Sequence, residues 1–186
     1  MDVCFNVESR FPDPVFRIEA SRTVFIEYEV GDSPRFSQDL SDLARIHGDT
    51  HVDCLVLDPG RGSINVPEGC GVYPAFSMDV SASEDEVDAV YTESVPGDDE
   101  SIWLMGDLSN VIAYSGRSAM WGCWGQRNLG IMAIRGADTS AFQGWRKSLR
   151  VSSGSLNEFL GIVAFNFRGD IIPPRILDDL VKNYPE

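Results

Sequence analysis

The sequence predicts a single α+β domain spanning 1–186, with a mainly antiparallel sheet and helices packed on one of its faces. Short segments rich in β-branched and aromatic residues follow one another with few residues between them, which is typical of antiparallel strands. Other segments have apolar residues at helical spacing behind capping residues. No linker or internal repeat divides the chain, and its 43% of hydrophobic residues suffices for one core.

Strands are expected at the start of the chain. Three segments, 3–8, 14–19 and 22–30, are rich in β-branched and aromatic residues that partly alternate with charged ones. Because only Ala20 and Ser21 clearly separate the second segment from the third, we expect these two strands to form a tight hairpin.

A helix and a buried strand are expected next. Apolar residues recur at helical spacing over 36–47. Ser33 can cap this helix, Pro34 suits its first position, and Gly48 is well placed to end it. The run VDCLVLD, 52–58, is almost continuously apolar and therefore predicts a strand buried on both faces.

The second half of the chain adds strands with short connections. They are expected over 101–107, 110–116, 118–125 and 128–136, which brings the sheet to about seven to nine strands.

Three helices are expected from local capping signals. Ser83 with Glu86, and Ser155 with Glu158, match the capping-box pattern ahead of a short helix and of a buried helix over 155–167. The pair Pro173-Pro174 opens a last short helix. We expect the 36–47 and 155–167 helices to cover the same face of the sheet.

The charge of the chain restricts its partners. Fifteen Lys and Arg face twenty-nine Asp and Glu, for a formal net charge of −14. Nucleic acids and anionic membrane surfaces are bound through Lys and Arg, so neither is an expected partner. No run of apolar residues is long enough to span a bilayer. A basic protein partner, or solubility alone, is what this charge favours.

The acidic residues are unevenly spread. Between Gly62 and Gly116 there are eleven acids and no Lys or Arg. Eight of the acids gather in the short helix and the loop after it, without the spacing of a calcium-binding hand. We interpret seven of them as a docking surface for a basic partner, with a solvated acidic face as the alternative: Glu84, Asp85, Glu86, Asp88, Asp98, Asp99 and Glu100.

The stretch HGDTHVD, 47–53, contains both histidines of the chain and raises the question of a metal site. Strand alternation places His51 and Asp53 on one face, but His47 ends a helix, where it suits the negative end of the helix dipole. Zinc prefers three or four convergent nitrogen or sulfur ligands. We therefore expect a polar corner and no bound metal, with His47, His51 and Asp53 as the candidate ligands of the alternative.

A hairpin with two tryptophans is the most unusual part of the sequence. Trp121 and Trp124 are three residues apart, so a regular strand turns them to opposite sides. They are expected either to be core residues or to include one surface anchor for a partner, with Arg127 in the following turn as a further contact.

The Trp-Gly-x-Trp-Gly-x-Arg-Asn hairpin, within 118–136, resembles those of small bacterial immunity-type and uncharacterised cytoplasmic proteins. The tail FNFRGDIIPPRILDDLVKNY is more loosely similar. Those families include antidotes encoded beside secreted antibacterial toxins. The resemblance implies a protein that binds and occludes a toxin, and it carries over no catalytic residue.

The sequence accordingly predicts a non-catalytic immunity protein that neutralises a basic toxin and needs no cofactor. It has no GxSxG, HExxH or CxxC motif, and its start lacks a signal-peptide pattern, so we expect a cytoplasmic location. A small hydrolase or ligand-binding enzyme with acidic residues remains an alternative, because paired carboxylates have no fixed spacing in sequence. An adaptor or assembly subunit is the third candidate.

Overall fold

The structure is a computed structural model. It describes residues 3–19, 22–31, 33–59, 75–92, 94–96, 102–104, 109–137 and 139–185. Within them, no helix is both long and apolar enough to cross a membrane.

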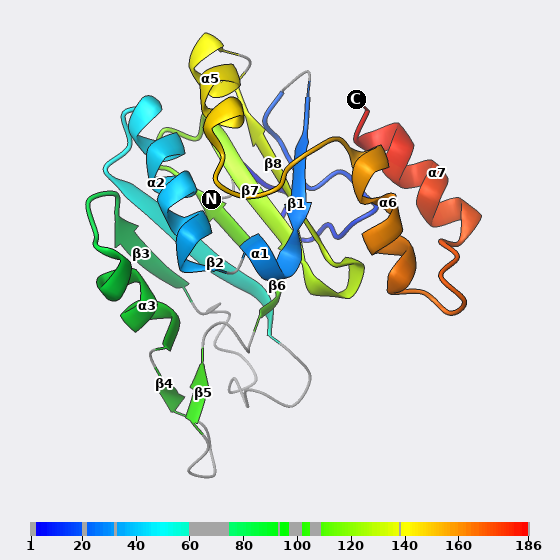
Figure 1. Cartoon of the computed structure of the whole chain (residues 1–186), viewed down its shortest axis with the longest axis horizontal. Helices are drawn as coiled ribbons and strands as arrows, with labels where there is room; N and C mark the ends of the chain where they lie inside the picture. The colour runs from blue at the N-terminus through cyan, green and yellow to red at the C-terminus, as the bar shows by residue number, and fades with distance from the viewer. Residues whose placement is uncertain are drawn as a thin grey trace.

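A six-stranded antiparallel sheet forms the centre of the molecule, in the order β1-β8-β7-β6-β2-β3 (Figure 1). The expected α+β fold class is confirmed. The strands are β1 (Val24–Glu27), β2 (His51–Pro59), β3 (Ala75–Asp79), β6 (Ser109–Ser115), β7 (Trp121–Gln126) and β8 (Ile131–Gly136). Two further strands, β4 (Ser94–Pro96) and β5 (Ile102–Leu104), form a separate antiparallel pair.

Helices and loops cover both faces of the sheet. One core contains the apolar sides of α2 (Pro34–Ile46), α3 (Glu84–Thr92) and α5 (Ser140–Ser148). The second core, on the opposite face, contains the N-terminal segment, α6 (Leu156–Phe165) and α7 (Pro174–Asn183). The expectation that the 36–47 and 155–167 helices share a face therefore needs correction.

The chain changes faces by crossing the β1 edge of the sheet. After α5, Gly154 pairs with Phe25 of β1 through two backbone hydrogen bonds of 2.9 and 3.0 Å. Figure 1 shows this connection passing β1 on its way to α6. A contact between residues so far apart in sequence leaves no local pattern, which is why the sequence did not reveal the crossing.

The helices marked by local capping signals are confirmed. The Ser33 hydroxyl accepts a hydrogen bond from the Phe36 N–H at the start of α2, and Gly48 follows the helix with a φ of 76°. Ser155 and Glu158 form the predicted capping box of α6. Helix α5 was not expected, although Thr139 caps it and Phe142 and Trp145 face the core from it.

The predicted hairpin between segments 14–19 and 22–30 is wrong. Residues 3–19 contain only one isolated bridge, between Phe5 and Phe16, and β1 pairs with β8 instead of forming the expected hairpin. Strand β1 ends at Glu27, and a short helix α1 (Tyr28–Gly31) follows. The apolar side chains of segment 3–19 pack over the second core. Such packing does not require a continuous ladder of hydrogen bonds between strands.

Arg135 of β8 contacts both the N-terminal segment 3–19 and the chain at the C-terminal end of α7. Its guanidinium carbon lies 5.1 Å from the Phe16 ring centre and 5.2 Å from that of Tyr184. The side chain also donates hydrogen bonds to the Thr23 hydroxyl, at 2.8 Å, and to the Asn183 carbonyl, at 3.0 Å. Burial lowers the pKa of this guanidinium, so its hydrogen bonds and aromatic neighbours must offset the lost hydration.

We expect Arg135→Ala to lower the free energy of unfolding by about 2–3 kcal/mol, because two hydrogen bonds and two cation–π contacts are lost. Urea denaturation measures the change. Arg175→Ala is the matched control, since the Arg175 side chain is 95% exposed. Equal losses in the two variants would contradict the proposed role of Arg135.

Candidate functional site

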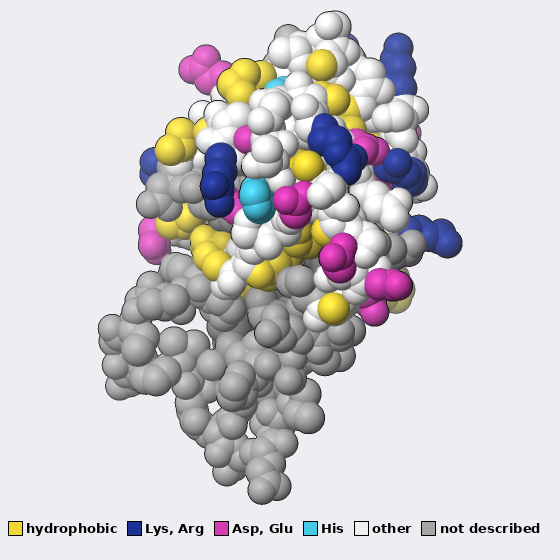
Figure 2. Space-filling model, turned by 90° about the vertical axis from the view of Figure 1, so that its left-hand side faces the viewer, with side chains coloured by type: hydrophobic (Ala, Val, Ile, Leu, Met, Phe, Trp, Pro, Cys, Tyr) yellow, Lys and Arg dark blue, Asp and Glu magenta, His cyan; other side chains and the backbone are white. Residues whose placement is uncertain are grey.

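Helix α3 presents acidic side chains to solvent at one edge of the molecule. Asp85, Glu86 and Asp88 are exposed, whereas Val87 is buried in the first core. Glu84 is the first residue of the helix. Figure 2 shows this side of the molecule, where the charged groups nearest the lower edge of the described surface are acidic. The other three predicted contact residues, Asp98, Asp99 and Glu100, lie outside the described residues.

The start of α3 holds Glu86 in a fixed position. The Ser83 N–H and hydroxyl donate to Glu86 Oε2 at 2.7 and 2.8 Å, and the Glu86 N–H donates back to Ser83 Oγ at 3.3 Å. The predicted capping box is thus confirmed. These hydrogen bonds from Ser83 keep the pKa of Glu86 below its usual value, so its carboxylate is negative at neutral pH.

Asp79, at the end of β3, is held in a similar way. Its Oδ1 accepts hydrogen bonds from the Ser81 hydroxyl, at 2.6 Å, and the Ser81 N–H, at 2.7 Å. These bonds lower the pKa of Asp79. Asp79 was not predicted as a site residue, although its Asp-Val-Ser spacing is typical of a turn closed by an aspartate side chain.

A hollow of about 430 Å³ joins the two carboxylates. Met78, Ala82 and Val87 contribute apolar surface to it, and Ser77 and Ser81 contribute hydroxyls. One oxygen of each carboxylate accepts hydrogen bonds from its serine, which fixes the side chain, and Oδ2 of Asp79 lies 3.9 Å from His51 Nε2. We call Asp79, Asp85, Glu86 and Asp88 the acidic face. Its chemistry suits a cationic group with an apolar stem.

Two arginines lie beside the acidic face but are matched by carboxylates of α2. Arg45 forms an ion pair with Asp42 at 2.7 Å and donates to the Val80 carbonyl. Arg150 pairs with Asp42 at 2.9 Å and with the buried Asp39. Their positive charge is therefore compensated locally.

The acidic-enzyme alternative requires a carboxyl that can donate a proton near neutral pH. Burial raises the pKa of Asp39, partly opposed by hydrogen bonds from Arg150. However, Asp39 is 1% exposed, and its two oxygens accept from the Arg150 side chain and backbone N–H. The carboxyls of the hollow, Asp79 and Glu86, have lowered pKa values. The two carboxylates of the hollow are therefore negatively charged at neutral pH.

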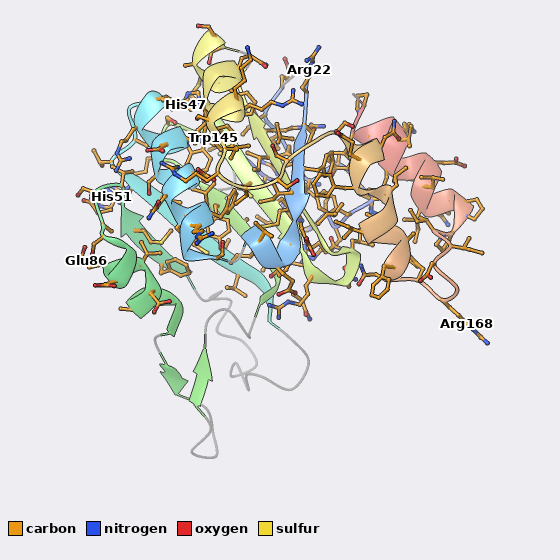
Figure 3. All side chains as sticks on the ribbon, viewed as in Figure 1. Arg22, His47, His51, Glu86, Trp145 and Arg168 are labelled. Carbon is orange, nitrogen blue, oxygen red and sulfur yellow. The ribbon has the colours of Figure 1, made fainter. Side chains whose placement is uncertain are left out.

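The two histidines occupy separate environments, as Figure 3 shows by their labels. His51 Nδ1 lies 2.9 Å from the Thr50 hydroxyl, and its Nε2 lies 3.9 Å from Asp79 Oδ2. Asp53 accepts a 2.6 Å hydrogen bond from Ser77 and lies 3.8 Å from Arg117. In the part of the chain that the structure describes, no three His, Cys, Asp or Glu side chains gather in a way that could hold a metal ion.

Both tryptophans of the hairpin are completely buried, so the surface-anchor interpretation is wrong. They face opposite sides of the sheet, as alternation predicts. Trp121 Nε1 donates to Asp49 Oδ2 at 3.0 Å, whereas Trp124 packs on Phe5 with ring centres 5.6 Å apart. The strand is central in the sheet and covered on both faces, which leaves no outward side for an anchor.

Arg127, the remaining predicted contact, is half-buried in the turn before β8. Its Nε lies 3.6 Å from Glu29 Oε1, and its guanidinium carbon is 5.1 Å from the centre of the Tyr28 ring. The structure therefore places Arg127 beside α1, whereas the acidic face is formed by β3 and α3.

Comparisons with protein-family models, with curated proteins and with solved structures found no match.

We expect Trp121→Phe to destabilise the protein more than Trp124→Phe. Both substitutions remove similar volume, but only the first removes a hydrogen bond to a buried carboxylate, since Trp124 Nε1 has no hydrogen-bond partner. The difference should be about 1.5–3 kcal/mol in the free energy of unfolding, measured with urea. Equal destabilisation would contradict the role of the Asp49 contact.

His47 should make stability depend on pH. Burial lowers its pKa below the 6.5 of the unfolded chain, with an opposing effect of Asp49, and its Nε2 is buried without a hydrogen-bond partner. The stabilisation is present above pH 6.5 and is lost as the pH falls toward the folded-state pKa.

The loss should be at most about 1.4 kcal/mol per pH unit, and His47→Gln should remove it. Unfolding measured at several pH values between 5 and 8 tests this, with His51→Gln as the control. If His47→Gln leaves the slope unchanged, the half-buried imidazole is not its source.

Proposed function

We propose that the protein is a non-catalytic inhibitor that binds a basic protein through the acidic face. One observation carries this proposal: hydrogen bonds fix Asp79 and Glu86 as negative carboxylates on an exposed surface, beside the further exposed acids of α3. The surface lies in a segment with eleven acids and no Lys or Arg. Ordering these side chains before binding reduces the entropy that binding loses.

The partner is a cationic toxin, as the resemblance to immunity-type proteins implies. A nuclease holds its substrate through Lys and Arg that contact phosphates. Carboxylates gathered on one exposed face can occupy the same cationic surface and exclude the nucleic acid. The net charge of −14 also accelerates encounter with a positive partner, which suits an antidote.

The other two candidate functions have less support. The carboxylates of the hollow are poor proton donors because their pKa values are lowered. The adaptor hypothesis depended on an exposed tryptophan, and both hairpin tryptophans are buried.

Reversing two charges of the acidic face tests the proposal. We expect Asp85→Lys with Asp88→Lys to slow association with the proposed basic partner about tenfold or more at low salt, and to flatten the salt dependence of the rate. Stopped-flow fluorescence measures both quantities.

The matched control reverses two exposed acids elsewhere, Glu8→Lys with Asp178→Lys, which changes the net charge equally. The control should slow association much less. The proposal fails if both pairs have the same effect, or if association does not depend on salt.

A further inference from the structure

A second pocket lies on the other side of the molecule from α3, between the end of β1 and helix α6. Its volume is about 410 Å³. The β1 side contributes Glu27 and Glu29, the turn before β8 contributes Arg127, and α6 contributes Gly161, Ile162 and Phe165. The pocket thus combines carboxylates on one wall with apolar side chains on the other.

The charge of this pocket is negative. Arg127 is already engaged by Glu29, at 3.6 Å, and by the Tyr28 ring, at 5.1 Å. Glu27 is exposed and forms no ion pair with a described residue. Two carboxylates against one matched guanidinium leave an excess of negative charge, which favours a cation as the occupant.

The apolar wall is exposed in a way that packing does not explain. The Phe165 side chain is 79% exposed, although a phenyl ring gains stability when it is buried. An exposed aromatic ring beside carboxylates offers a surface on which a planar guanidinium can stack. The apolar wall therefore favours an arginine side chain over a metal cation, because only the arginine can stack on the ring.

Gly161 lines the pocket without a side chain. It lies within α6, where glycine is less stable than alanine, and a Cβ at this position would meet no atom within 4 Å. Neither backbone conformation nor close packing requires glycine here. A large side chain at this position would therefore add volume at the pocket without displacing a packed neighbour.

We propose that this pocket binds an arginine side chain of the protein partner. The stem of the arginine lies on Ile162 and Phe165, and its guanidinium contacts Glu27 and Glu29. The inference rests on the proposed function for the source of the arginine. The arginine pocket and the acidic face are separate contacts of one partner.

The test uses the whole 186-residue chain and two small probes. N-acetyl-arginine amide carries the cation, and N-acetyl-citrulline amide has nearly the same shape without the charge. In a titration followed by ¹H–¹⁵N NMR, we expect the arginine probe to shift the amide signals of Gly130, Gly161 and Asn166 saturably. The citrulline probe should bind at least about tenfold more weakly.

Gly161→Leu should weaken binding of the arginine probe about tenfold or more by filling the pocket. Gly144→Leu is the matched control, because Gly144 is also an exposed helical glycine whose Cβ would meet no atom within 4 Å. The control should bind like the unmodified protein. Since neither leucine replaces a packed atom, both variants should fold.

Three results would overturn the proposal: equal binding of citrulline, unchanged binding in Gly161→Leu, or no saturable shift at the pocket. The shifts are read at Gly130, Gly161 and Asn166, which lie at the arginine pocket, so a probe molecule bound at the acidic face does not enter the result. If the pocket does not bind the arginine probe but association with the partner still depends on salt, the proposed function is therefore still supported. Arginine binding without any effect of Asp85→Lys and Asp88→Lys would support the pocket and refute the proposed function.

Discussion

The buried carboxylate of Asp49 is the contact on which the arrangement of the sheet depends. It accepts hydrogen bonds from the Ser118 N–H at 2.6 Å, the Ser118 hydroxyl at 2.7 Å and Trp121 Nε1 at 3.0 Å. A Cβ at Gly116 would lie only 1.9 Å from one carboxylate oxygen, so glycine gives the carboxylate its space. Because a buried carboxylate is stable only when it is well hydrogen-bonded, the turn after α2 and the turn between β6 and β7 must be positioned together.

This constraint extends from the core to the acidic face. Strand β2 begins two residues after Asp49, and its first residue, His51, is paired with Asp79 of β3. Helix α3 follows β3 closely and is held by the burial of Val87 and by the bond from Arg45 to the Val80 carbonyl. The carboxylates are therefore attached to the sheet by a short, ordered path. An ordered charged surface loses less entropy on binding than charges on a flexible tail.

Local signals in the sequence predicted the parts of the fold that are determined locally. Ser33, Ser83 and Ser155 marked the starts of three helices, and alternation placed Trp121 and Trp124 on opposite faces. The sequence could not reveal contacts between distant residues. Segments 3–8 and 14–19 have the composition of strands. However, an extended segment that packs over a core without strand pairing requires the same β-branched and aromatic residues. The sequence predicted that the acidic helix belongs to the candidate site. It could not predict that both tryptophans are buried, because the helices and segments that cover them are distant in sequence.

Charge and shape contribute different parts of recognition in such a protein. A field from excess carboxylates extends about 8–10 Å at physiological salt and attracts any cationic protein, so it sets the rate of encounter and provides little selectivity. Selectivity requires contacts that only one partner can complete. The hollow between Asp79 and Glu86 and the pocket beside Phe165 both combine carboxylates with apolar surface. Because they lie on different sides of the molecule, only a partner with suitably spaced cationic side chains could fill both at once.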